Sequence, residues 1–273
     1  MAHFQYTVSL PSSRLDRSLR LPALLTLLLL LTGIGKAQAQ DGRAILLKTL
    51  KAYQALHSYS GEATVAMTIV PPKGTAFTGR SSSFMAFQRP NKIHLRLAST
   101  HSSRNIYSDG TTLSVYDVAT NQYHTVPVAG KQADLVPLLA AEGVSSNLDP
   151  LFFLFAKILP QELTNVHLKS STEYFGGHPV YVVTGTTITP AGKSKSSPTI
   201  TLGPTSSWAW WIDRQSFLVY RVETVTPNSA VRYFRGNLVV RHSVLKLQAN
   251  PVLPASEFVF TPPPNSVGKQ PGQ

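Results

Sequence analysis

The expected fold is organised around one stretch of the sequence, Trp208-Ala-Trp-Trp-Ile-Asp-Arg-Gln-Ser-Phe-Leu-Val-Tyr-Arg-Val-Glu-Thr224. Side chains alternate between the two faces of an extended chain, so Trp208, Trp210 and Ile212 share one side of a first strand. The same alternation places three residues of a second strand on one side: Leu218, Tyr220 and Val222. Polar residues between the two strands supply turn chemistry. We therefore expect a β-hairpin with one apolar face and no catalytic group.

Length and composition allow one large domain. The chain has 273 residues, 42% of them hydrophobic, which is enough for a sizeable core. It contains no cysteine, which excludes disulfides and also a lipid anchor of the bacterial lipoprotein type. Stability is therefore expected to come from the core alone.

The N-terminus has the pattern of a secretory signal peptide. Arg14, Arg17 and Arg20 precede an apolar run over residues 21–31, and Ala37-Gln-Ala39 has the small residues of a cleavage site. We expect cleavage after Ala39 and export to the periplasm. The alternative interpretation is a signal anchor that is not cleaved.

The chain is basic, with a formal net charge of +12, of which the predicted leader carries +3. Export argues against nucleic acid as a partner and favours anionic lipid headgroups or an acidic envelope protein. Residues 63–108 hold six bases and no acid. Five of these bases make up a predicted basic surface: Arg80, Arg89, Lys92, Arg96 and Arg104. The alternative is that they are solvated charges that guard strand edges against aggregation.

An amphipathic helix is predicted over Asp41–Tyr59, with apolar residues at helical spacing: Leu46, Leu50, Tyr53 and Leu56. Closely spaced hairpins follow. In the first, Arg89-Pro-Asn-Lys92 joins two strands, the second of which carries Ile93, Leu95 and Leu97 on one face. Asp109-Gly110 opens the next turn, before a strand with Leu113 and Val115 on one face. This succession predicts an antiparallel meander.

Two further helices are predicted in the middle of the chain, over Gln132–Glu142 and Asp149–Leu159. Asp149 is the expected N-cap of the second, and Pro160 stops it. Apolar residues, including Leu154, run round most of this second helix, so it should be buried against something broad and apolar. A concave sheet is the natural candidate.

Strands resume after the helices and continue to the C-terminus. Phe258-Val-Phe-Thr261 is predicted to form a closing edge strand that the following prolines terminate. Residues 265–273 are predicted to form a disordered tail.

Six segments in this order resemble the periplasmic lipoprotein-carrier superfamily of LolA and LolB, and in particular an uncharacterised branch of exported bacterial proteins. They are the helix ending at Tyr59-Ser-Gly61, Arg89-Pro-Asn-Lys92, Tyr107–Asp117, Gly176-Gly-His-Pro-Val-Tyr181, Trp211-Ile-Asp213 with Leu218–Arg221, and Phe258-x-Phe-x-Pro-Pro263. The resemblance implies an α+β fold of mainly antiparallel β-structure. It would be a strongly curved, incomplete β-barrel over residues 40–264, with helices lidding the concave face.

The resemblance also implies a hydrophobic cavity that takes a lipid, an acyl chain or a lipoprotein. The candidate lining residues are Ile93, Leu95, Leu97, Leu113, Val115, Leu154, Trp208, Trp210 and Tyr220. In the carriers an arginine that faces the cavity couples opening to release, and Arg89 lies in the matching motif, beside a turn. The alternative interpretation is that the tryptophans and the apolar helix are plain core.

Signatures of catalysis and of metal binding are missing. None of the eight histidines forms an HxH, HxxxH or HExxH pair, and the sequence has no nucleophile elbow, P-loop or dinucleotide fingerprint. Asp109, Asp117 and Asp213 stand where turns favour aspartate. We therefore predict no metal, no cofactor and no enzymatic activity.

Two functions remain. The first is a monomeric periplasmic binder or carrier of a hydrophobic ligand. The second is a sensory or regulatory module that docks another envelope protein. A carrier should retain lipid when it is purified, and a regulator should retain a protein.

Overall fold

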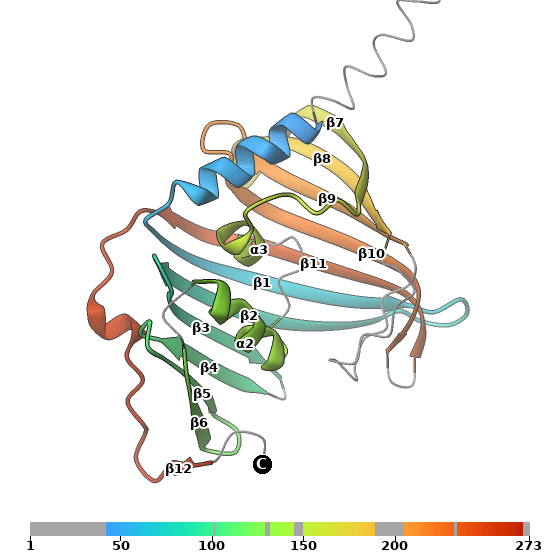
Figure 1. Cartoon of the computed structure of the whole chain (residues 1–273). Coiled ribbons are helices and arrows are strands. Elements are labelled where there is room, and N and C mark those ends of the chain that lie inside the picture. Colours follow the sequence, from blue (N-terminus) through green and yellow to red (C-terminus); the bar gives the residue numbers. More distant parts are fainter. Residues whose placement is uncertain are drawn as a thin grey trace, which may run out of the picture. The chain divides into compact units, whose positions relative to one another are not determined.

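One open sheet organises the chain. The computed structural model describes residues 42–100, 102–128, 132–144, 150–188, 205–231 and 234–269, and the predicted signal peptide lies outside them. Across the sheet the strands follow the order β12 (Val267–Gly268), β6 (Gln122–Pro127), β5 (Thr112–Asp117), β4 (Ser103–Ser108), β3 (Lys92–Ser99), β2 (Phe77–Gln88), β1 (Ser58–Val70), β11 (Phe234–Ala249), β10 (Val219–Val231), β9 (Thr205–Asp213), β8 (His178–Ile188) and β7 (Leu163–Phe175) (Figure 1).

Two antiparallel meanders make up this sheet and meet at its centre. Strands β1 to β6 form the first by consecutive pairing, β7 to β11 form the second, and β1 pairs antiparallel with β11. The pairing of β1 with β2 runs without a slip from Ser58↔Gln88 to Ile69↔Phe77, which keeps alternate side chains on the same face. Strands β7 and β12 lie at opposite edges, so the described sheet does not close. The predicted fold class is confirmed.

Helices lie over the concave face of the sheet: the N-terminal helix (residues 42–54), α2 (Gln132–Ala141) and α3 (Pro150–Phe155) (Figure 1). The predicted apolar stripe of the N-terminal helix is buried, with Leu46 and Tyr53 at 0% exposure. This helix ends before the predicted limit at Tyr59. Ser58 and Tyr59 already pair with Gln88 and Phe87 in the sheet, which leaves them extended.

Helix α3 is shorter than the predicted helix over Asp149–Leu159, because it ends at Phe155. Asp149, the expected cap, lies outside the described residues. Beyond the helix the chain turns so that Leu159 enters the core at 5% exposure. The carbonyls that follow α3 accept hydrogen bonds from the N-terminal helix instead: Gln54 Nε2 donates to Ala156 O (3.2 Å) and Lys157 O (3.1 Å).

The C-terminal segment differs most from the prediction. Phe258–Thr261 does not form a closing strand, and Ala255–Phe258 is instead a 3-10 turn, η2. The edge is formed further on by β12, which pairs parallel with β6, and Lys269 N donates to Tyr123 O (2.7 Å). The predicted disorder is therefore wrong for residues 265–269, while residues 270–273 lie outside the described part.

The core consists of two clusters on the concave face. The first, here the tryptophan cluster, is formed by Ile45, Leu46, Leu50, Tyr53, Leu56, Tyr59, Phe87, Phe153, Leu154, Leu159, Leu163, Val166, Val183, Trp208, Trp210, Ile212, Leu218, Val219 and Val222. The second, here the leucine cluster, is formed by Ile93, Leu95, Ile106, Leu113, Val115, Val128, Leu135, Leu139, Val144 and Leu151.

Candidate hydrophobic binding site

The leucine cluster contains most of the predicted cavity residues of the first meander. Ile93 and Leu113 both pair with Ser108 in the ladder, and Leu95 and Val115 both pair with Ile106, so each pair belongs to one row across the sheet. Leu95 and Val115 are 4% and 3% exposed, and Ile93 and Leu113 are fully buried. Leu97 is half-buried and packs against the same cluster. Helix α2 covers these rows with Leu135 and Leu139.

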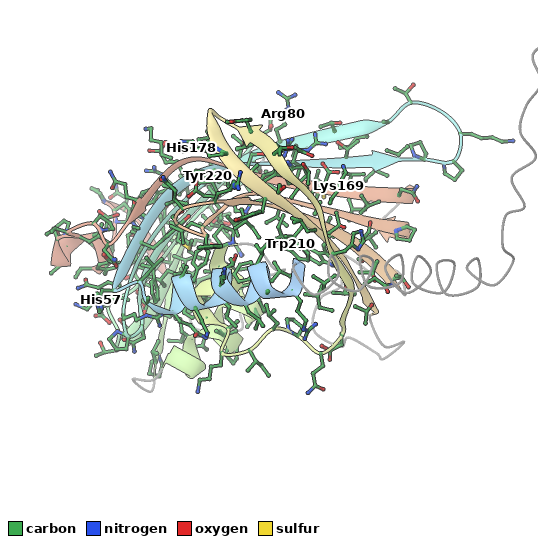
Figure 2. All side chains as sticks on the ribbon, turned by 90° about the horizontal axis from the view of Figure 1, so that it is seen from above. His57, Arg80, Lys169, His178, Trp210 and Tyr220 are labelled. Carbon is green, nitrogen blue, oxygen red and sulfur yellow. The ribbon has the colours of Figure 1, made fainter. Side chains whose placement is uncertain are left out.

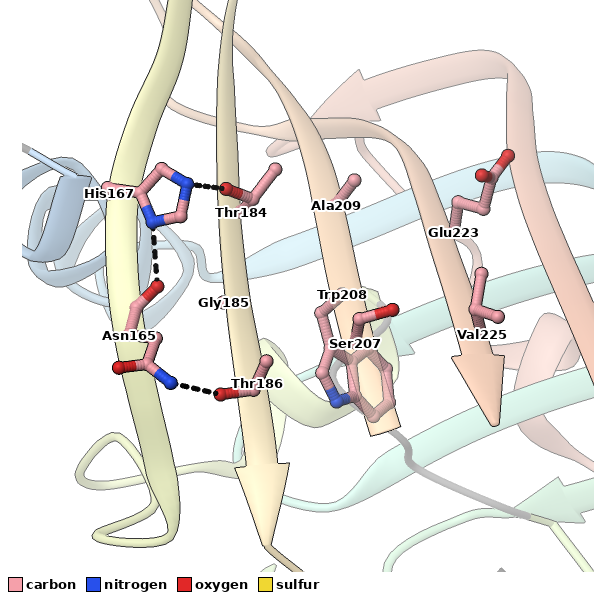
Figure 3. A pocket seen from close by; sticks show the side chains of 10 residues that line it. All are labelled: Asn165, His167, Thr184, Gly185, Thr186, Ser207, Trp208, Ala209, Glu223 and Val225. Atoms are coloured by element: carbon pink, nitrogen blue, oxygen red, sulfur yellow. Dashed lines mark hydrogen bonds between the residues drawn. The ribbon is translucent and has the colours of Figure 1, made fainter. Parts of the chain in front are cut away.

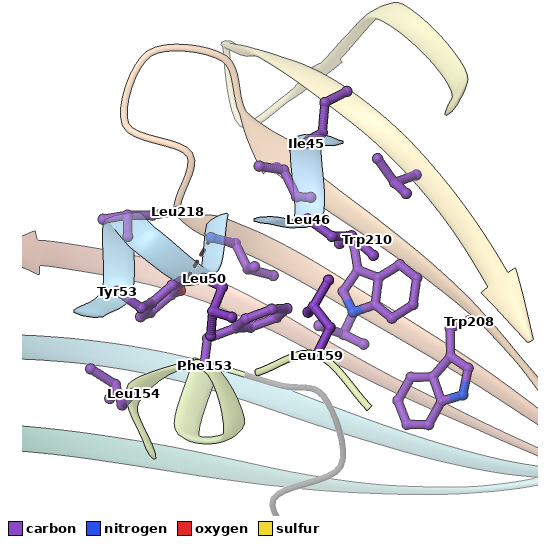
Figure 4. Packing of buried hydrophobic residues seen from close by; sticks show 14 of the residues in the cluster. Ile45, Leu46, Leu50, Tyr53, Phe153, Leu154, Leu159, Trp208, Trp210 and Leu218 are labelled. Atoms are coloured by element: carbon purple, nitrogen blue, oxygen red, sulfur yellow. Dashed lines mark hydrogen bonds between the residues drawn. The ribbon is translucent and has the colours of Figure 1, made fainter. Parts of the chain in front are cut away.

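The three residues that alternation places on one face of the tryptophan hairpin are buried together. Trp208, Trp210 and Ile212 are buried in one cluster with Leu46 and Leu50 (Figure 4). The two indoles stack with ring centroids 6.0 Å apart and an interplanar angle of 6°. Trp208 Nε1 also donates to Thr187 Oγ1 at 2.9 Å, which satisfies its polar edge.

Helix α3 lies where the two clusters meet. Phe153 and Leu154 belong to the tryptophan cluster, Leu151 belongs to the leucine cluster, and Phe155 packs against both. Phe153 stacks on Tyr53 of the N-terminal helix at 5.6 Å. Side chains of this short apolar helix therefore occupy the space between the other helices and the sheet (Figure 4).

Tyr220 does not line this site. The register between β9 and β10 shifts between Val219 and Arg221, and the extra residue turns Val219 inward opposite Ile212. Tyr220 instead stacks on His178 at 4.8 Å, on the face away from Trp210 (Figure 2). Burial and then the charge of Asp213 raise the pKa of Tyr220. Its assignment to the cavity was wrong because the prediction assumed strict alternation along β10, and an inserted residue reverses the direction of the side chains that precede it.

Arg89 links the N-terminal helix and α3 to the turn between β2 and β3. Its Nε donates to Leu56 O (2.7 Å), just beyond the N-terminal helix, and its second guanidinium nitrogen donates to Tyr53 O (3.1 Å) and Leu154 O (3.5 Å). Burial lowers the pKa of Arg89. A cation placed on the last carbonyls of a helix is favourable, so Arg89 stabilises the arrangement in which both helices cover the sheet.

Other polar contacts hold the helices in the same way. Val219 N donates to the buried Tyr53 hydroxyl at 3.2 Å, which joins the N-terminal helix to β10. At the end of α2, Arg104 donates to Glu142 O (2.8 Å), and His124 Nε2 lies 2.9 Å from the Glu142 carboxylate. The helices are thus fastened at their ends, while apolar side chains fill the space between them and the sheet.

The five predicted bases do not form one surface. Arg89 and Arg104 reach helix carbonyls, on the concave side and at its rim. Arg96 points the other way, with its guanidinium 5.2 Å from the centre of the Phe84 ring. Lys92 and Arg80 alternate with inward residues on β3 and β2, and Arg80 is exposed. The prediction of a single basic surface was wrong because a run of basic residues in the sequence does not show to which face of the sheet each side chain points.

The sequence analysis missed two polar groups of the N-terminal helix, Thr49 in its buried stripe and Gln54 on its exposed side. Thr49 is fully buried, and its Oγ1 is without a hydrogen-bond partner in the described structure. It occupies the same stripe as Leu46, Leu50 and Tyr53, so its position was readable from helical spacing. The role of Gln54 was not readable, since it depends on where the chain leaves α3.

A hollow of about 270 Å³ opens on the convex face, not between helices and sheet. The core row across β8, β9 and β10 consists of Val183, Trp210 and Val222, which point to the concave face. The next row consists of Thr184, Ala209 and Glu223, which therefore point to the convex face. The lining of the hollow mixes polar and apolar residues, and His167 bonds Thr184 Oγ1 (2.8 Å) and Asn165 O (2.8 Å) at its rim (Figure 3). Of the predicted cavity residues, Trp208 alone borders it.

The described residues contain no cluster of three or more histidine, aspartate or glutamate side chains placed to hold a metal ion. None of the helices described has both the length and the apolar character to cross a membrane.

Solved structures of low identity are similar to the chain. LprF from Mycobacterium bovis is 14% identical, with a TM-score of 0.45, over 80% of this chain and 97% of that one. The MucA/MucB complex of Pseudomonas aeruginosa gives 13% identity and a TM-score of 0.42 over 81% of this chain, which spans only 61% of the matched chain. A LolA superfamily protein from Nitrosomonas europaea is 13% identical, with a TM-score of 0.31, over 80% of this chain and 97% of that one.

No curated protein matches the chain at a significant level. A family model does match, and it covers residues 42–268, nearly all of the folded part. Its family is described as a predicted periplasmic protein, DUF2092, and the chain belongs to this family.

Proposed function

We propose that the chain is a periplasmic, non-enzymatic binder or carrier of a hydrophobic ligand: a lipid, an acyl chain or a lipoprotein. The observation that carries the proposal is helix α3. Its six residues, Pro-Leu-Phe-Phe-Leu-Phe, fill the junction of the two clusters on the concave face. A helix of six residues is too short to be stable alone, so its position depends on the contacts it makes. Those contacts are apolar, and an acyl chain can replace them.

Burial of methylene groups gives the scale of such an exchange. Each methylene contributes about 0.8 kcal/mol, so a sixteen-carbon chain contributes about 13 kcal/mol in all. A micromolar dissociation constant needs about 8 kcal/mol. The remaining roughly 5 kcal/mol is near the low end of what association costs, before the displacement of α3 is counted. Long acyl chains are therefore suitable ligands, and short ones are not.

In this proposal Arg89 sets how readily the site opens. Its guanidinium contacts carbonyls at the ends of the N-terminal helix and of α3, so these two helices cannot separate from the sheet unless these bonds break. The role agrees with that of the arginine expected from the lipoprotein carriers. Arg104 and His124 hold α2 through Glu142. Because these groups are engaged in holding helices, we assign them no catalytic step.

Tryptophan fluorescence tests the proposal. Trp210 is fully buried beside α3, whereas Trp211 lies on the convex face against Arg221. Palmitate, added below its critical micelle concentration, should shift the emission of the protein. Trp210→Phe should abolish most of this shift, and the matched control Trp211→Phe should retain it. No shift in the wild-type protein contradicts the proposal, as does a shift that depends on Trp211 alone.

The second candidate, a regulatory module that docks another envelope protein, has support elsewhere on the molecule. It rests on aromatic side chains that gather on the convex face of β2 to β6. Lipid retained on purification favours the carrier, and a retained protein favours docking.

A further inference from the structure

Aromatic side chains gather on the convex face of the first meander. Because Ile93 and Leu95 point to the helices, His94 between them points outward, and so does its register partner Tyr107 on β4. The aromatic side chains of this face form what we call the aromatic groove: Phe84, His94, Tyr107, Tyr116 and Tyr123, from β2, β3, β4, β5 and β6. His94 is stacked on Tyr107 at 4.2 Å and meets Phe84 edge-on at 5.4 Å. Nothing in the concave site uses this face.

The chain's own C-terminal segment occupies this groove. Residues 251–269, here the C-terminal strap, run along the outer side of β3 to β6 and end at β12 (Figure 1). Phe260 lies among three tyrosines, with ring centroids 5.6 Å from Tyr107, 6.0 Å from Tyr116 and 5.2 Å from Tyr123. Glu257 Oε1 lies 2.8 Å from His94 Nδ1.

The strap has the chemistry of a peptide ligand. It holds Pro251, Pro254 and the run Pro262–Pro264, and outside the single turn η2 and the two residues of β12 it has no regular structure. Proline-rich segments lose little conformational entropy on binding, and grooves lined by aromatic residues are a recurring way of recognising them. The groove and the strap therefore correspond to a receptor and its ligand within one chain.

The strap does not satisfy every polar group of the groove, so a different peptide could make hydrogen bonds that the strap does not make. Two side-chain atoms in and beside the groove, His94 Nε2 and Asn105 Oδ1, are buried with no hydrogen-bond partner among the residues that the structure describes. Asn105 faces outward on β4, opposite Arg96 and next to Tyr116. Buried polar atoms without partners cost free energy. On the strap itself, Val252, Val259 and Val267 are left exposed.

We propose that the aromatic groove is a docking surface for an extended, proline-rich peptide of a partner protein, and that the C-terminal strap occupies it in cis. A fitting partner carries a phenylalanine for the three tyrosines and an acidic residue for His94, next to the cation Arg96. It also supplies hydrogen bonds that the strap leaves unmade. The strap then competes with the partner, so docking requires the strap to detach. This inference is independent of any ligand on the concave face.

A labelled peptide with the sequence of residues 254–265 tests the groove on the full-length protein. In the wild-type chain the strap holds the groove closed, which weakens apparent binding by the fraction of molecules that are open. Phe260→Ala loosens the strap and should tighten peptide binding about tenfold or more by fluorescence anisotropy. Val259→Ala, at the exposed neighbouring position, should bind as the wild-type protein does. A peptide with alanine in place of both phenylalanines should not bind.

Hydrogen exchange on the wild-type protein gives a second readout that needs no variant. Excess unlabelled peptide should speed exchange of the Val267 and Lys269 amides, which bond to Asn121 and Tyr123, and leave β4 and β5 unchanged. The proposal is overturned if Phe260→Ala stays folded and binds the peptide no better than the wild-type protein does. It is also overturned if exchange at the strap does not respond to the peptide. If Phe260→Ala forms dimers that the peptide dissociates, the occupant is a second copy of this chain and the partner assignment is wrong.

Discussion

Replacing Arg89 by alanine is the sharpest perturbation of the concave site. The substitution removes a bond of 2.7 Å to Leu56 O and one of 3.1 Å to Tyr53 O, together with a long contact to Leu154 O. Bonds from a charged donor contribute about 1.5–3 kcal/mol each, and the charge at a helix end adds about 0.3–1 kcal/mol. Arg89 is only half-buried, which reduces these values. We expect Arg89→Ala to lower the free energy of unfolding by about 2–4 kcal/mol.

The same variant should bind acyl chains more tightly, because the bonds it loses stabilise the closed arrangement. A closed state weakened by about 2 kcal/mol lowers the apparent dissociation constant of palmitate by up to about 30-fold. Urea unfolding measures the stability, and the fluorescence titration measures the affinity. Arg89→Lys keeps the charge but not the planar guanidinium, so its stability and its palmitate affinity should lie between those of the wild-type protein and Arg89→Ala. If stability falls but palmitate affinity does not change, Arg89 supports the fold without controlling access, and the reasoning is wrong.

Three further predictions address other parts of the molecule. Gly42→Ala should destabilise by about 1–3 kcal/mol in urea unfolding, because its Cβ would stand 2.5 Å from the His167 backbone, while Gly79→Ala, with open space around it, should be neutral. Thr49→Val should raise the melting temperature, because it removes a buried hydroxyl without a partner at equal shape; a drop contradicts this interpretation. Burial lowers the pKa of His94 despite Glu257, so its contribution to stability should be present above about pH 6.5 and lost as the pH falls through the lowered value. Melting curves between pH 7.5 and 5 should show this loss, and His94→Gln should flatten it.

The fold was predictable where burial on one face imposes a strict alternation. Ile93, Leu95 and Leu97 on β3, and Trp208, Trp210 and Ile212 on β9, lie on the face that their spacing predicts. The stripe of the N-terminal helix was readable for the same reason at a different period. Such patterns survive folding because a shift by one residue would expose the whole apolar set.

The errors have two causes, an inserted residue that alternation does not reveal and contacts with residues far away in sequence. Tyr220 left the concave face because one residue is inserted opposite β9. Phe258 and Phe260 alternate like a strand, yet the tyrosines of β4 to β6 bind Phe260 in an irregular segment. Arg89 reaches helix carbonyls 33 and 36 residues away in sequence. No local pattern contains these partners.

Native mass spectrometry of the protein, purified without detergent from cells that express the full-length chain, is the most direct test of a ligand site on the concave face. We expect a second mass series above that of the protein alone, at an increment that fits an acyl lipid and is released by gentle collisional activation. Arg89→Ala should increase the occupancy of that series. The protein mass alone, unchanged after incubation with palmitate or phospholipid, would contradict the assignment of the concave face as a ligand site.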